Sequence, residues 1–141
     1  MFRRTIVVDA EPGAVFDLTQ DYGRRLDWDP FLREARLLGG AEAAGVGVRA
    51  WCVSRGGWGM ETEYVSFRRP GACAVRMTRG PWFFRSFSGS WRFDEVGPGR
   101  TRATFAYQLA GRPGALSIML RLVFAREARR RLEALGRAFE A

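Results

Sequence analysis

The sequence PGALSIMLRLVFAREARRRLEALGRAF, residues 113–139, decides the fold class of this chain. It predicts one long amphipathic helix, and it follows a series of glycine-punctuated segments rich in bulky aromatic residues. A single helix laid across one curved antiparallel sheet leaves space that side chains rarely fill completely. This arrangement therefore favours a pocket for an apolar small molecule over a surface enzyme cleft.

Six segments with strand character precede this helix and are separated by short turns. They cover residues 33–38, 46–54, 58–68, 72–78, 87–93 and 101–109. The clearest alternation is FSGSWRF at 87–93, where the odd positions are apolar or glycine and the even positions are polar. A spacing of ~10 residues per strand with short turns predicts antiparallel pairing throughout.

The first thirty residues predict a strand at 3–8 and two short helices at 10–18 and 21–31. Pro12 falls in the first turn of the first helix, and Asp9 is its expected cap. The second helix should end before Pro30, because the residue before a proline disfavours the helical region. The predicted class is α+β, with a curved antiparallel sheet of about seven strands wrapped around the C-terminal helix.

Composition limits the chemistry that this chain could perform. The 141 residues contain no histidine, which removes the usual general base near neutral pH and any histidine-containing triad or zinc site. Cys52 and Cys73 lie on strands predicted to flank a third, about 9.5 Å apart, which is too far for a disulfide. We therefore expect two reduced thiols, no metal and no cofactor.

The net charge of +8 comes from arginine alone, since the chain has no lysine. This usage is typical of a GC-rich genome and predicts a bacterial source. The arginines are scattered apart from a cluster on the last helix, and no nucleic-acid-binding motif accompanies them, so we expect no nucleic-acid partner. No apolar run reaches ~18 residues, and the N-terminus has the pattern of a strand, so we expect a cytoplasmic protein without stable membrane insertion.

Four features of this element order resemble the START-like (SRPBCC) helix-grip superfamily, in particular its polyketide cyclase/dehydrase and lipid transport branch. They are IVVDAEPGAVF at 6–16, WDPF at 28–31, GVG at 45–47 and the closing helix. The resemblance implies one START-like domain over residues 1–141. It also implies a deep hydrophobic cavity between sheet and C-terminal helix that holds lipids, sterols, polyketides or other apolar molecules. Carriers, sensors and cyclases share this fold, so the fold does not choose among them.

Aromatic and methionine side chains dominate the candidate site, together with one arginine. Tryptophan and tyrosine are costly to bury without polar partners, which a ligand or water in a cavity can supply, and methionine adapts its shape. For any one of these residues an ordinary core position is the alternative. The candidate ligand-binding residues are Trp28, Phe31, Trp51, Met60, Tyr64, Met77, Phe87, Trp91, Tyr107 and Arg121.

Arg121 is the one charged residue among these candidates, so its orientation decides whether the predicted cavity contains a charge. At 100° per residue it falls near the middle of the helix face that carries Ile118, Leu122, Ala125, Leu132, Leu135 and Phe139. The first half of the helix also has apolar residues on the opposite side, namely Leu116, Met119, Leu120 and Val123. Arg121 could therefore face the cavity, the solvent or an internal ion pair, and the outward apolar patch predicts a homodimer contact or a mobile lid.

Arg49 is a secondary candidate for the cavity. The acidic residues near the candidate site are expected at the surface. They are Asp27, Asp29, Glu61 and Glu63.

Three functions remain open at this stage. The leading hypothesis is binding of an apolar or aromatic small molecule without chemistry. The second is a polyketide cyclase or aromatase in which a side chain polarises a carbonyl, although no residue is assigned a catalytic role. The third is an interaction protein that presents its arginine-rich last helix to an acidic partner.

Overall fold

The computed structural model describes residues 2–140 and has the element order that the sequence predicts. The strands are β1 (Phe2–Val8), β2 (Leu32–Leu37), β3 (Arg49–Ser54), β4 (Gly59–Arg68), β5 (Ala72–Arg79), β6 (Phe84–Gly97) and β7 (Arg100–Gly111). The helices are α1 (Pro12–Gln20), α2 (Arg25–Trp28) and α3 (Leu116–Ala138). The fold class is confirmed, with both short helices after the first strand.

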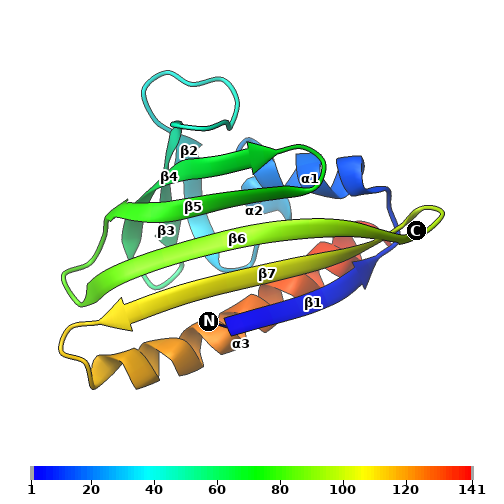
Figure 1. Cartoon of the computed structure of the whole chain (residues 1–141). Helices are drawn as coiled ribbons and strands as arrows, with labels where there is room; N and C mark the ends of the chain where they lie inside the picture. Colours follow the sequence, from blue (N-terminus) through cyan, green and yellow to red (C-terminus); the bar gives the residue numbers. More distant parts are fainter. Residues whose placement is uncertain (1, 141) are drawn as a thin grey trace.

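The seven strands form one curled antiparallel sheet in the order β1-β7-β6-β5-β4-β3-β2 (Figure 1). Strands β2 to β7 are neighbours in sequence order, joined by short turns except for the longer loop 38–48 between β2 and β3. Strand β1 pairs with β7 from Phe2 opposite Tyr107 to Val8 opposite Thr101. Helix α3 packs along β1 and β7, α1 packs on β6 and β7, and α2 lies between β2 and α3. The sheet and helices therefore enclose a common interior.

Alternation on β6 and β7 builds the wall of this interior. On β6 the inward side chains include Trp91 and Phe93, and on β7 they include Phe105, Tyr107 and Leu109. All five are at least nine-tenths buried, as the period-2 pattern predicts. The turn between the two strands uses Gly99 at a φ of +65°, a left-handed conformation that glycine adopts without strain.

The buried face of α3 differs from the predicted one in the first half of the helix. Leu120, Phe124 and Ala128 point inward, whereas Ile118 is 67 % exposed and Leu122 is 70 % exposed. The prediction was wrong here because this half has apolar residues on two opposite sides, so its periodicity does not select one face. In the second half, Leu132 and Leu135 are buried as predicted.

The start of α1 is also held differently from the prediction. The residue before the helix is Glu11, and its carboxylate accepts a hydrogen bond from the backbone N–H of Gly99 at 2.9 Å. Asp9, the predicted cap, instead lies 3.7 Å from Arg100. Pro12 stands in the first turn as predicted. Across the described part of the chain, no helix combines the length and hydropathy needed to cross a membrane.

Candidate ligand-binding site

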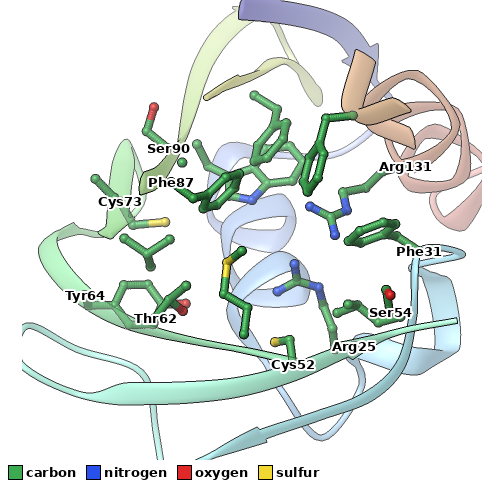
Figure 2. A pocket seen from close by; sticks show the side chains of 18 of the residues that line it. Arg25, Phe31, Cys52, Ser54, Thr62, Tyr64, Cys73, Phe87, Ser90 and Arg131 are labelled. Carbon is green, nitrogen blue, oxygen red and sulfur yellow. The ribbon is translucent and has the colours of Figure 1, made fainter. Parts of the chain in front are cut away.

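A cavity of about 110 Å³ lies between the inner face of the sheet and helices α2 and α3 (Figure 2). Side chains from β3 to β7 line one side, and side chains from the α2 region and α3 line the other. Most of the lining is aromatic or aliphatic. Its volume is somewhat below the ~150 Å³ of an apolar cavity known to bind benzene, so a ligand portion of one aromatic ring matches its size.

Five of the predicted site residues meet in this cavity. They are Phe31, Met60, Tyr64, Phe87 and Trp91. Met60 and Tyr64 come from the same face of β4, and Phe87 and Trp91 from the same face of β6. Further lining residues were not among the predicted site. Those with the largest apolar side chains are Leu32, Trp58, Phe84, Phe105 and Phe124.

Three predicted residues pack close to the cavity without lining it. Trp28 is buried behind Trp91, with ring centroids 6.5 Å apart. Tyr107 stacks on the ring of Phe87 at 6.4 Å and an interplanar angle of 19°, on the side away from the cavity. Met77 packs against the edge of the core and is not part of the cavity wall.

Trp51 and Arg121 lie away from the cavity. Trp51 covers Gly59 on the outer side of the sheet, in a surface hollow. Its strand has apolar residues on both faces, so parity alone could not choose between them. Arg121 is exposed beside Tyr107 and Gln108, because Leu120 and Phe124 take the inward positions of α3. The secondary candidate Arg49 is also exposed, and its guanidinium lies 3.8 Å from the Glu61 carboxylate.

Glu61 is not at the surface as expected. Its side chain is 9 % exposed and accepts a hydrogen bond from the Thr78 hydroxyl at 2.7 Å. It remains on the outer face of β4, because its neighbours Met60 and Thr62 line the cavity. Neighbouring side chains on the outer face therefore cover this carboxylate.

The cavity also has a charged end that sequence reasoning did not find. Asp29, expected at the surface, is 1 % exposed. Its carboxylate lies 2.8 Å from the Arg25 Nε and 3.1 Å from the Arg131 Nε. Arg25 and Arg131 line the cavity (Figure 2). Asp29 is in contact with both but does not belong to the cavity lining.

Local sequence explains why these three side chains meet. Arg25 and Asp29 are four residues apart, at the start and just after the end of the short helix α2. The second Asp29 oxygen accepts the backbone N–H of Phe31 at 3.0 Å, which fixes the turn through Pro30. Arg131 follows Phe124 and Ala128 on the inward face of α3, so the correct helix phase would have identified it.

The charges set the protonation state of this cluster. Burial would raise the pKa of the Asp29 carboxyl, but Arg131 and Arg25 outweigh that effect and hold the pKa below its usual range. Burial would lower the pKa of Arg25, but Asp29 raises it overall. For Arg131 burial dominates, and the pKa is lowered despite the contact with Asp29. Asp29 is therefore ionised at neutral pH between two buried guanidinium groups.

A second polar feature of the cavity is a chain of hydrogen bonds that begins at Tyr22 and Tyr64. The hydroxyls of Tyr22 and Tyr64 lie 3.0 Å apart, and Tyr64 donates to the side-chain carbonyl of Gln20. Burial raises the pKa of both tyrosines, so both phenols stay neutral at physiological pH. Tyr22, Tyr64 and Gln20 all line the cavity.

Both cysteines contribute to the cavity wall as unpaired thiols, on β3 and β5 as expected. Burial raises the pKa of the Cys73 thiol to about 12 and also raises that of Cys52. These thiols are therefore neutral at physiological pH and act as apolar surface.

The arrangement combines a mainly apolar chamber with one positively charged end. Among the lining side chains in residues 2–140 there is no aspartate or glutamate, and the sequence has no histidine. The lining therefore offers hydrogen-bond donors and apolar contact, but no group that readily accepts a proton at neutral pH.

Comparisons with known proteins agree with this architecture. The family model described as "Polyketide cyclase / dehydrase and lipid transport" matches residues 1–140. A START superfamily protein from Mycobacterium smegmatis superposes with a TM-score of 0.85 at 11 % identity, covering 98 % of this chain and 95 % of that one. No curated protein matches the sequence significantly.

Two enzymes are also among the similar solved structures. The Zhui aromatase/cyclase from Streptomyces sp. R1128 gives a TM-score of 0.78 at 19 % identity, over 95 % of this chain and 89 % of that one. Norcoclaurine synthase from Thalictrum flavum, solved with dopamine and hydroxybenzaldehyde, gives 0.71 at 12 % identity, over 97 % and 84 %. At these identities the likeness concerns the fold.

Proposed function

The chain belongs to the polyketide cyclase/dehydrase and lipid transport family, and on this premise we propose that it binds an apolar or aromatic small molecule in the cavity between the sheet and α3. Residues 1–141 act in this proposal as one START-like domain. The observation that carries it is the lining itself, in which Trp91, Phe87 and Phe105 surround a space of about 110 Å³. Burial of apolar ligand surface there contributes about 25 cal/mol per Å².

The residues that we assign to ligand contact are those of the predicted set that line the cavity, Phe31, Met60, Tyr64, Phe87 and Trp91. Met60 and Phe87 give an adaptable wall, while Tyr64 is held by its hydrogen bonds to Tyr22 and Gln20. Trp28, Met77 and Tyr107 support this wall from behind. Trp51 and Arg121 have no contact role in the proposal.

The cyclase alternative is less well supported by this lining. A cyclisation by proton transfer needs a group that accepts a proton near neutral pH. The cavity-lining tyrosines and cysteines have raised pKa values, and no carboxylate joins them within the described residues. We therefore favour binding and release of an unchanged ligand.

The alternative of an acidic partner on α3 is also weakened by local pairing. Arg130 lies 3.4 Å from Glu127, and Arg129 lies 4.0 Å from Glu133. Arg131 points to the cavity cluster. Intrahelical pairing of this kind is typical of a solvated helix face.

Calorimetric titration with benzamide, a neutral one-ring probe that matches the cavity volume, tests the proposal. Gly89 lines the cavity, and a Cβ placed there would lie 3.6 Å from Phe87 and 3.7 Å from Phe105, which is ordinary contact. The additional methyls of Gly89→Val should occupy ligand space and weaken binding at least tenfold. The matched control is Ser88→Val, because Ser88 is exposed on the same strand. Equal affinity of Gly89→Val and Ser88→Val, or absence of binding by both the amide and the corresponding carboxylate, would contradict the proposal.

A further inference from the structure

The ion cluster at the end of the cavity contains more positive than negative charge. Two guanidinium groups, Arg25 and Arg131, share the one carboxylate of Asp29. Their side chains are only 9 % and 11 % exposed, and that of Asp29 is fully buried. The cluster therefore places one uncompensated positive charge at the cavity wall.

The contacts with Asp29 leave the terminal nitrogens of both arginines available. Each arginine reaches the carboxylate through Nε, and Arg25 also donates from Nη1 to the Thr19 carbonyl at 3.3 Å. The other terminal nitrogens have no hydrogen-bond partner among the described residues, and none of them is fully buried. Figure 2 shows both guanidinium groups on the same side of the cavity. These N–H groups therefore face the space where a ligand would lie.

No other lining group balances this charge. The remaining polar side chains that line the cavity in residues 2–140 are neutral. They are Gln20, Tyr22, Cys52, Ser54, Thr62, Tyr64, Cys73 and Ser90. Carboxylates on neighbouring elements are paired elsewhere, Glu34 with Arg36 and Glu127 with Arg130.

Aromatic rings keep water away from the two guanidinium groups. The Arg131 guanidinium carbon lies 5.1 Å from the centre of the Phe31 ring and 5.4 Å from that of Phe105. The Arg25 guanidinium lies 5.5 Å from the Trp28 ring and 5.6 Å from the Tyr22 ring. Cation–π contact offsets part of the lost hydration. An unbalanced buried charge remains costly until a counter-charge arrives.

We propose that the ligand is an aromatic or otherwise apolar carboxylic acid, whose carboxylate binds the free N–H groups of Arg25 and Arg131 while its body fills the apolar chamber. This inference rests on the proposed function and specifies the class of ligand. Charge-assisted, forked hydrogen bonds to a carboxylate are the strongest that guanidinium groups make. Apolar contact then holds the rest of the molecule.

Two ligands of nearly the same shape separate the contribution of the charge to the affinity from that of the apolar body. Benzoate and benzamide have the same ring and differ in charge. By isothermal titration calorimetry at pH 7, the wild-type protein should bind the carboxylate at least tenfold more tightly, which corresponds to about 1.4 kcal/mol. Arg131→Gln should remove this preference, because it weakens binding of the carboxylate more than binding of the amide.

The control variant tests whether total charge explains the preference. Arg129→Gln removes one positive charge from the same helix, at a side chain that is 58 % exposed. It should retain the full preference for the carboxylate. Arg131→Lys, which keeps the charge and loses the planar fork, should have an intermediate preference, and circular dichroism checks that each variant is folded.

Each outcome bears on one of the two proposals. Equal affinity of the wild-type protein for acid and amide would overturn the carboxylate inference and leave the proposed binding function intact. A preference that Arg129→Gln removes as fully as Arg131→Gln would also overturn it. Failure of both ligands to bind the folded wild-type protein would overturn the binding function, and the carboxylate inference with it.

Discussion

The hydroxyl groups of Tyr22 and Tyr64 lie 3.0 Å apart, and the direction of the hydrogen bond between them is fixed. Tyr64 gives its single proton to the Gln20 carbonyl, so Tyr22 must be the donor to Tyr64. The chain continues from the Gln20 amide to the Thr19 hydroxyl at 3.0 Å, and from there to the Phe16 carbonyl at 2.9 Å. Every proton in this chain therefore points from the cavity toward α1.

Tyr64→Phe should break this chain in the middle. Gln20 would lose its donor and Tyr22 its acceptor, and leaving such buried groups unpaired costs about 1–3 kcal/mol. We expect a decrease of this size in the free energy of unfolding, measured by urea denaturation. Tyr107→Phe is the matched control, because the Tyr107 hydroxyl is buried without a partner among the described residues. Its removal should leave stability unchanged or slightly increased, and equal losses in both variants would contradict the assignment.

Asp29→Asn should destabilise the fold more than any substitution of its partners. It would leave two buried guanidinium groups without a counter-charge, and breaking a buried ion pair in this way costs about 3–5 kcal/mol. Arg131→Gln should cost less, since the Arg25–Asp29 pair at 2.8 Å stays intact and neutral. Urea denaturation of both variants measures the difference. A larger loss for Arg131→Gln would show that the second arginine, and not the carboxylate, holds the cluster together.

Stability should decrease on acidification because of the same carboxylate. The pKa of Asp29 is lower in the folded protein than its ordinary value of about 3.9. Its contribution is therefore complete above about pH 4 and is lost as the pH falls through the folded pKa. Urea midpoints measured from pH 6 to pH 2.5 should fall at the acidic end, and less steeply in Asp29→Asn. Asp17→Asn, at an exposed pair with Arg69, should leave the profile almost unchanged.

The two thiols should react slowly in the folded protein. Burial raises the pKa of Cys73 to about 12 and raises that of Cys52, so little thiolate is present at pH 8. Titration with a disulfide reagent should label both cysteines quickly in urea and only slowly without it. The single variants Cys52→Ser and Cys73→Ser assign each reaction. Fast labelling of either thiol in the folded protein would show that the cavity opens readily to solvent.

The sequence predicted the parts of the site that depend on local periodicity. Phe87 and Trp91 lie on a strand whose outward positions are polar, so their inward direction was readable. Trp51 lies on a strand with two partly apolar faces, and Arg121 lies on a half-helix with apolar residues on opposite sides, so both were misplaced. Asp29 was missed for another reason: its burial depends on Arg131, which only the tertiary fold brings near.

The contact between Asp29 and Arg131 also makes the charged end of the cavity depend on the docking of α3. Arg25 is four residues from Asp29, so their pair can form as soon as α2 does. Arg131 lies 102 positions further along the chain, and it reaches Asp29 only where α3 is docked on the sheet. The second guanidinium group is therefore in place only when the last helix is docked. A molecule in which α3 is transiently undocked could keep most of its sheet and would still lack the charged end of its cavity.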